Sequence, residues 1–206
     1  MALFCLPELK KNVNFWFIDE SEKDLIDQLN LSIDFRLKLE KIKSLQKRKQ
    51  FLAVHMILKS MQIDQKTLSY DQNGKPILND GQYISISHSY NYCGVVVGES
   101  KLGLDIEKLR PKIFNISSKF LSKNEALLIK NLNIENLTKV WTIKESVFKA
   151  FGHTGLSFKD NITIIKIDHE FLSAVVEINF DNKIENYSID IITFSQYICS
   201  IASKIN

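Results

Sequence analysis

The distribution of apolar and polar residues predicts strands and helices in separate blocks. Residues 83–89 (YISISHS) alternate between apolar and polar, as a half-buried strand does. Further strands are predicted at 13–18, 92–97, 102–106, 162–167, 172–178, 187–193 and 198–202, and helices at 22–29, 34–60, 113–120, 123–131 and 136–151. This order predicts an α+β fold with two similar halves, residues 1–103 and 104–206.

The long helical stretch at 34–60 predicts either two helices or one kinked helix. Its apolar positions are the expected core residues of the N-terminal half, namely Leu37, Ile42, Leu45, Phe51, Leu52, Ile57 and Leu58. A turn signal follows at 71–74 (DQNG), and Lys75 and Pro76 come directly after it.

Composition narrows the class of protein. Of the 206 residues, 45% are apolar and 25% are charged, which is typical of a globular chain. The net charge of +3 is too small to indicate a nucleic-acid partner, which requires a basic stripe. It is compatible with an acidic protein partner or a polyanionic small molecule.

The cysteines and the apolar runs indicate the cellular compartment of the protein. Cys5, Cys93 and Cys199 are far apart and form no C-x-x-C pair, so neither a disulfide framework nor a zinc knuckle is expected. No stretch approaches the roughly 18 apolar residues of a membrane span. Glu8 and Lys10 interrupt the N-terminal apolar run, so no secretory leader is expected. We expect a cytoplasmic protein without a membrane partner.

Two carboxylates on one strand form the first candidate site. Asp105 and Glu107 are two residues apart in the strand predicted at 102–106, so their side chains point to the same face. Neighbouring carboxylates repel each other unless a cation lies between them, and hard oxygen ligands suit Mg²⁺. The alternative is a pair of solvated residues at a strand end.

Two further groups of polar residues extend this candidate site. Glu145 and Lys149 share one helix face, where they form either an ordinary surface ion pair or a third metal ligand beside a phosphate-binding lysine. His88 lies between Ser87 and Ser89, and these three side chains either bind phosphate oxygens or belong to an ordinary strand edge. The phosphate-binding glycine loops and the G-x-S-x-G nucleophile turn are absent, so phosphate binding would rely on side chains and a metal.

Taken in order, these segments resemble the Sfp-type 4′-phosphopantetheinyl transferase family. The motifs are GKP at 74–76, ISISHS at 84–89, GLDIE at 103–107, FLSKNE at 120–125, WTIKESVFKAFG at 141–152 and GLS at 155–157. The resemblance covers residues 74–158. It implies two similar α+β halves related by a pseudo-twofold, with coenzyme A in the cleft between them.

The resemblance also implies a role for individual residues. Asp105, Glu107 and Glu145 match the acidic residues that hold Mg²⁺. The residues that match positions contacting coenzyme A are Lys75, Ser87, His88 and Lys149, with Arg48 as the candidate in the N-terminal half. Glu125 matches a glutamate proposed as a base.

The implied reaction is Mg²⁺-dependent transfer of the phosphopantetheine arm to a serine of an acidic acyl or peptidyl carrier protein, with release of 3′,5′-ADP. Lys149 would stabilise the leaving phosphate. Either Glu125 or Glu145 would take the serine proton, directly or through a water molecule. A monomer is expected. The alternatives are a Mg²⁺-dependent phosphoanhydride hydrolase and a binding module without chemistry.

Overall fold

The computed structural model describes residues 3–5, 11–29 and 31–205. Its strands are β1 (Leu3–Cys5), β2 (Asn12–Phe17), β3 (Leu68–Tyr70), β4 (Pro76–Leu78), β5 (Tyr83–Ser89), β6 (Tyr92–Gly98), β7 (Leu102–Lys108), β8 (Ile162–Ile167), β9 (Ser173–Phe180), β10 (Lys183–Phe194) and β11 (Tyr197–Lys204). Its helices are α1 (Glu22–Leu29), α2 (Ile33–Glu40), α3 (Leu45–Ser60), α4 (Ile113–Phe120), α5 (Lys123–Ile129) and α6 (Ile134–Phe151), with a 3₁₀ turn at Gln65–Thr67.

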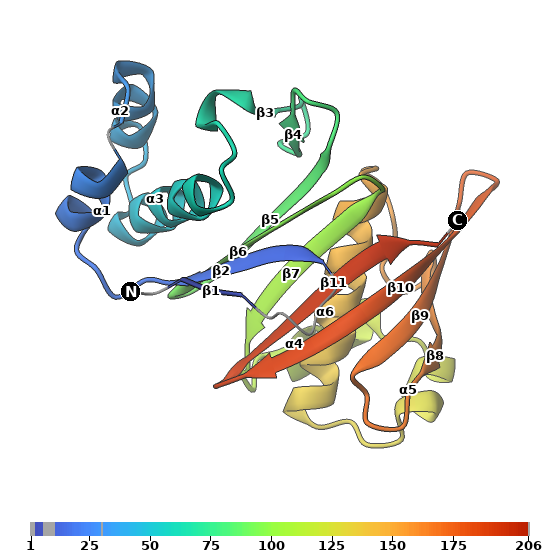
Figure 1. The fold of residues 1–206 in the computed structure, drawn as a ribbon. Coiled ribbons are helices and arrows are strands. Elements are labelled where there is room, and N and C mark those ends of the chain that lie inside the picture. The colour runs from blue at the N-terminus through green and yellow to red at the C-terminus, as the bar shows by residue number, and fades with distance from the viewer. Residues whose placement is uncertain (1–2, 6–10, 30, 206) are drawn as a thin grey trace.

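Two antiparallel sheets form the centre of the molecule (Figure 1). The first sheet has the order β1-β2-β6-β5, and the second has the order β7-β11-β10-β9-β8. The chain leaves the first sheet at Gly98 and enters the second at Leu102. Strands β3 and β4 form a separate small hairpin. The described part of the chain is therefore an α+β fold.

Three apolar clusters stack the elements into four layers. One cluster packs α1 and α3 on the first sheet, with Leu25, Leu52 and Val95 among its buried members. Another packs α6 on the second sheet, with Ile143, Val147 and Ile198. The third lies between the two sheets and includes Phe15, Leu104 and Ile201. The order is helices, sheet, sheet, helices, so that β5 and β7 lie side by side at the junction (Figure 1).

Serine hydroxyls join these two edge strands. The backbone N–H groups of β7 that point away from β11 need partners, because a buried N–H without one is costly. Oγ of Ser85 accepts from Leu104 N (2.9 Å), Oγ of Ser87 accepts from Ile106 N (3.1 Å), and Oγ of Ser89 accepts from Lys108 N (3.3 Å). The alternating serines of 83–89 thus replace a backbone ladder between the sheets.

Gly103 sets how closely α6 approaches β7. A Cβ at this position would overlap the carbonyl oxygen of Ser146 and lie 2.7 Å from the backbone nitrogen of Ala150. Both atoms belong to the backbone of α6, which cannot move aside as a side chain can. Because residues two apart in a strand share a face, Asp105 and Glu107 follow Gly103 on the side that α6 covers.

The hydrophobic pattern predicted most elements close to their observed bounds. The stretch at 34–60 is two helices, because Ser32 and Ser44 each cap a new helix by accepting a backbone N–H. Two of its expected core residues are wrong: Leu37 is 51% exposed and Leu45 is 59% exposed. Leu37 lies on the outer face of α2, and Leu45 lies in the first turn of α3. No other described layer covers either side chain. Glu8 and Lys10 lie outside the described residues, and no described helix is long and apolar enough to cross a membrane.

We expect Gly103→Ala to destabilise the fold by about 1–3 kcal/mol or more, because the added methyl group must push the α6 backbone off β7. Gly98→Ala is the matched control, since its Cβ would lie 2.8 Å from the end of the Leu102 side chain, which can rotate. Urea unfolding of the two variants measures the difference. Equal free energies of unfolding would contradict a backbone clash at Gly103.

Candidate active site

A cluster of three carboxylates and one lysine lies where β5, β7 and α6 meet. Strand β7 supplies Asp105 and Glu107, and α6 supplies Glu145 and Lys149. Nζ of Lys149 donates to Oδ1 of Asp105 (2.8 Å) and to the carbonyl oxygen of Leu104 (3.0 Å). The helix face that carries residues 145 and 149 therefore faces the carboxylates of the strand.

Hydroxyl groups of β5 complete the cluster. Ser87 donates to Oδ1 of Asp105 (3.0 Å), and Ser89 donates to Oε2 of Glu107 (3.2 Å). Asp105 is 5% exposed, and its second oxygen, Oδ2, is buried and has no hydrogen-bond partner among the described residues. A buried carboxylate oxygen without a partner is unfavourable, so this atom is suited to bind a cation.

Two of the three carboxyl groups, those of Glu107 and Glu145, have raised pKa values. Burial, and next the negative charge of Asp105, raise the pKa of Glu107. Burial and then Asp105 raise the pKa of Glu145 from 4.5 to about 7, although Lys149 acts in the opposite direction. Three acidic groups with one lysine among them form a site whose negative charge is incompletely neutralised.

The donor set fits a hard divalent cation such as Mg²⁺. Among the described residues no three His, Cys, Asp or Glu side chains lie close enough to form a ready-made metal cage. Mg²⁺ does not need such a cage, because it keeps waters and takes ligands from substrate phosphates. The unpartnered Oδ2 of Asp105, with Glu107 and Glu145 beside it, provides the protein's share of such a site.

A groove of about 570 Å³ opens beside this cluster. Its walls come from α3, β5, β7, α6 and the turn before β4, and its polar lining includes Lys47, Ser87, His88, Asp105, Glu107 and Lys149. The pKa of His88 is lowered, chiefly by partial desolvation and also by the ammonium groups of Lys149 and Lys47. The two ammonium groups favour a bound anion, and the imidazole of His88 can donate one hydrogen bond to it in its neutral form.

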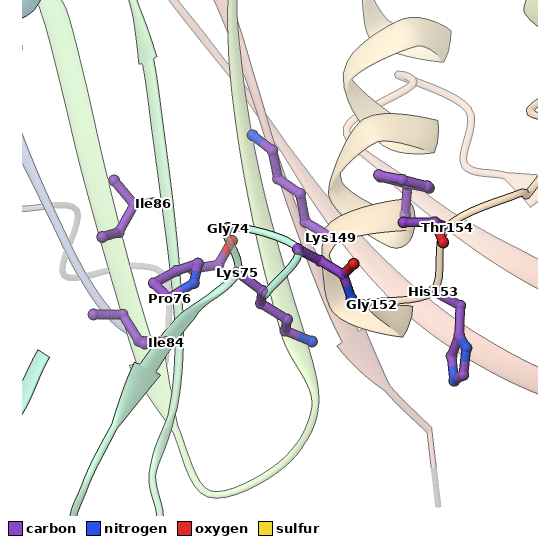
Figure 2. A pocket seen from close by; sticks show the side chains of 12 residues that line it. Gly74, Lys75, Pro76, Ile84, Ile86, Lys149, Gly152, His153 and Thr154 are labelled. Carbon is purple, nitrogen blue, oxygen red and sulfur yellow. The ribbon is translucent and has the colours of Figure 1, made fainter. Parts of the chain in front are cut away.

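A second cavity of about 250 Å³ lies next to this groove, between the turn at 73–76 and the end of α6 (Figure 2). Lys75 lines it, and its ammonium group donates to the carbonyl oxygen of Ala150 at the C-terminus of α6 (3.4 Å). Burial lowers the pKa of Lys75, and Lys101 adds to that effect. Gly152, in the left-handed conformation, ends α6 beside this lysine.

The structure brings together most of the residues that the sequence singled out. Asp105, Glu107, Glu145, Lys149, Ser87 and His88 lie in or beside the groove, and Lys75 lies in the adjoining cavity. The hydrogen bonds of Ser87 do not suit the phosphate-binding role predicted for it. Its single proton goes to Asp105, and its lone pairs accept from Ile106 N and from Lys149 (3.1 Å), so no capacity remains for a phosphate.

Arg48 has a different environment from the one predicted. Its guanidinium group donates to Oε1 of Glu22 (2.8 and 2.5 Å) and to the carbonyl oxygen of Leu39 (3.1 Å), so it ties α3 to α1 and α2. Lys47 lines the groove instead, because successive helix residues point about 100° apart. The spacing of Lys47, Phe51 and Val54 along one face of α3 is the sequence signal that would have identified it.

Glu125 has its contacts away from the carboxylate cluster. It is 1% exposed and forms an ion pair with Lys144, which is 0% exposed (2.7 Å). Its oxygens also accept from the backbone nitrogens of Ser122 (2.9 Å) and Ile164 (3.0 Å). Lys144 in turn donates to the carbonyl oxygens of Phe158 and Ile162. This network fastens α5, α6 and β8 together and leaves Glu125 no free face, which argues against its predicted role as a base.

Comparison with known proteins identifies relatives for about half of the chain. Residues 101–202 match the family model of the 4′-phosphopantetheinyl transferase superfamily. The 4′-phosphopantetheinyl transferase ffp of Bacillus subtilis is 36% identical over 95 residues, which are 43% of this chain and 42% of that protein. Sfp of Bacillus subtilis (strain 168) is 31% identical over 110 residues, or 50% and 49%. The 4′-phosphopantetheinyl transferase gsp of Aneurinibacillus migulanus is 26% identical over 102 residues, or 47% and 43%. The matched parts thus span under half of each relative.

We expect the metal-free protein to lose stability as the pH rises through about 7. The folded protein holds a proton on Glu145 more tightly than the unfolded chain does, so the stabilisation is complete below about pH 4.5 and is lost above about pH 7. At ~1.4 kcal/mol per pKa unit, the loss is at most about 3 kcal/mol. Melting temperatures in EDTA from pH 5 to pH 8 measure it. Glu145→Gln is the control and should show a smaller decrease; the same decrease in both proteins would contradict the assignment.

We expect Glu125→Ala to cost about 3–5 kcal/mol, because it leaves the ammonium group of Lys144 buried without its partner. Glu125→Leu combined with Lys144→Met should recover part of that loss, since the two buried charges are then removed together. Chemical denaturation of the single and double variants gives the coupling energy. Strictly additive losses would show that the pair does not act as a unit.

Proposed function

We propose that this chain, which belongs through residues 101–202 to the 4′-phosphopantetheinyl transferase superfamily, is a Mg²⁺-dependent enzyme acting on coenzyme A. It transfers the 4′-phosphopantetheine arm of coenzyme A to a serine of a carrier protein and releases 3′,5′-ADP. The observation that carries the proposal is the cluster of Asp105, Glu107 and Glu145 beside Lys149, with one buried carboxylate oxygen unpartnered at the edge of a groove.

In this proposal the three carboxylates hold Mg²⁺. Asp105 contributes Oδ2, the oxygen for which no protein donor is present, and Glu107 and Glu145 neutralise the remaining charge of the ion. When bound, Mg²⁺ supplies positive charge next to the pyrophosphate oxygens of coenzyme A. Binding the ion also requires the carboxylates to release the protons that their raised pKa values favour.

The lysines and the imidazole that line the groove and the adjoining cavity would bind the phosphates. Lys149 lies next to the carboxylates, and its three N–H donors go to Ser87, Leu104 and Asp105, so it would stabilise charge on the leaving phosphate through its positive charge. His88 and Lys47 line the same groove and are suited to bind a phosphate group further along coenzyme A. The cavity beside Lys75 adjoins the groove and is suited to the nucleotide end.

The chemical step is an in-line displacement. The hydroxyl oxygen of the carrier serine forms a bond to the β-phosphorus, the bond from that phosphorus to the 3′,5′-ADP oxygen breaks, and the serine proton leaves. Because Glu145 holds Mg²⁺ in this proposal, its carboxylate is already ionised and would be a weak base, so the serine proton would pass to a water molecule of the groove. Glu125 receives no catalytic role, because its oxygens are committed to Lys144 and to backbone N–H groups.

Several features of the proposal concern the whole protein. An acidic carrier protein is the proposed partner, and the net charge of +3 is compatible with it. We also propose that the protein is a monomer, that it works in the cytoplasm, and that the halves 1–103 and 104–206 are related by an internal two-fold. The change of sheet between Gly98 and Leu102 supports the last point.

The direct test is intact-protein mass spectrometry of an apo acyl carrier protein mixed with this protein, coenzyme A and Mg²⁺. We expect the carrier to gain the mass of one phosphopantetheine arm, and we expect EDTA to abolish the gain. Asp105→Asn should reduce the rate at least 100-fold, because it removes a carboxylate charge from the metal site. Glu177→Gln, on β9 of the same sheet, is the matched control and should retain the wild-type rate.

The negative outcomes separate the alternatives. Consumption of coenzyme A without any gain by acyl or peptidyl carriers would replace the transferase with a phosphoanhydride hydrolase. Unchanged coenzyme A in the presence of several carriers would overturn both enzymatic functions and favour a binding module. Full activity of Asp105→Asn would remove the carboxylate cluster from the mechanism.

A further inference from the structure

Three buried serines of β5 occupy equivalent positions but have unequal contacts. Ser85, Ser87 and Ser89 are 4%, 5% and 7% exposed, and each hydroxyl accepts a backbone N–H of β7. Acceptance of an N–H uses a lone pair and leaves the hydroxyl proton free to be donated. The proton of Ser87 goes to Asp105, and that of Ser89 goes to Glu107.

We infer that Ser87 is a positioning residue for the metal site: its hydroxyl fixes Oδ1 of Asp105 and thereby leaves Oδ2 free to bind the cation. This inference rests on the proposed function. The geometry that supports it is the pairing of Oδ1 with both Ser87 (3.0 Å) and Lys149 (2.8 Å), while Oδ2 of the same buried carboxylate has no partner. Two donors on one oxygen restrict rotation of the carboxylate about its terminal bond, so the other oxygen keeps a constant direction.

Ser87 is itself held from the other side. Its hydroxyl accepts from the backbone nitrogen of Ile106 (3.1 Å), the residue that follows Asp105 in β7. The orientation of Asp105 is therefore coupled to the contact between the two sheets. Hydrogen bonds that orient a metal ligand typically contribute a factor of 10–100 to metal affinity.

Ser89, two residues after Ser87 on the same face of β5, makes the same kind of contacts. It accepts from Lys108 N (3.3 Å) and donates to Oε2 of Glu107 (3.2 Å), so the second carboxylate is oriented by the same device. Ser85 is the internal control, because it accepts from Leu104 N (2.9 Å) at the equivalent position but lies beside Gly103, which has no side chain to receive its proton.

The experiment compares Ser87→Ala with Ser85→Ala. Both variants lose one buried acceptor for a β7 N–H, and Ser87→Ala also loses its hydrogen bonds with Asp105 and Lys149, so its melting temperature in EDTA should fall further. Mg²⁺ is then titrated calorimetrically into each protein saturated with coenzyme A, with no carrier protein present. We expect Ser87→Ala to bind Mg²⁺ about tenfold more weakly than the wild type. Ser85→Ala should stay within about twofold.

The other possible results of this experiment overturn the inference. Equal Mg²⁺ affinities for the two variants would overturn the positioning role while leaving the proposed transferase untouched, since the carrier-modification assay measures that function separately. A wild-type protein that binds no Mg²⁺ would overturn both the inference and the metal site on which it rests. Where Ser87→Ala does not fold and Ser85→Ala does, Ser87→Cys takes its place, because a thiol fills a similar space but is a weak hydrogen-bond donor. An unchanged Mg²⁺ affinity for Ser87→Cys would then overturn the inference.

Discussion

The contact between the edge strands β5 and β7 is the constraint on which the rest of the molecule depends. Two sheet edges that meet inside a protein must satisfy their backbone groups, and here the hydroxyls of Ser85, Ser87 and Ser89 do so. A serine is short enough for a side-chain oxygen to reach the neighbouring strand and still carries a proton to donate. The same three serines that join the two sheets therefore bring polar groups to the carboxylates of β7.

A second constraint brings the helix to this junction. Gly103 removes the side chain that would keep α6 away from β7, and the buried pair of Lys144 and Glu125 holds the helix against α5 and β8. Residues 144 and 145 are neighbours with opposite surroundings. Lys144 points into a fully satisfied buried network, whereas burial, and next the charges of Asp105 and Glu107, raise the pKa of Glu145. The helix is thus fixed on one side by a completed ion pair and presents an uncompensated carboxylate on the other.

Most secondary-structure elements and most candidate site residues could be predicted from the sequence, because alternation and helical spacing are local properties. The pair Asp105 and Glu107 was readable as one strand face, and Glu145 with Lys149 was readable as one helix face. The role of a side chain that depends on its hydrogen-bond and ion-pair partners could not be predicted from the sequence pattern. Arg48 and Lys47 are adjacent, and only the packing of α3 against α1 decides that Glu22 binds the former while the latter lines the groove.

The sequence by itself determined the α+β class, the alternating serines, the acidic pairs and the family resemblance, since each depends on residue type and short-range spacing. The tertiary structure alone decided which charges meet. It committed Glu125 to Lys144, committed the hydroxyl of Ser87 to Asp105, and left Oδ2 of Asp105 without a partner. The physical reason is that a polar side chain's capacity for hydrogen bonds is small and fixed, so its function depends on which neighbours have already used that capacity. Those neighbours come from β5, β7, β8 and α6, which only the folded chain brings together.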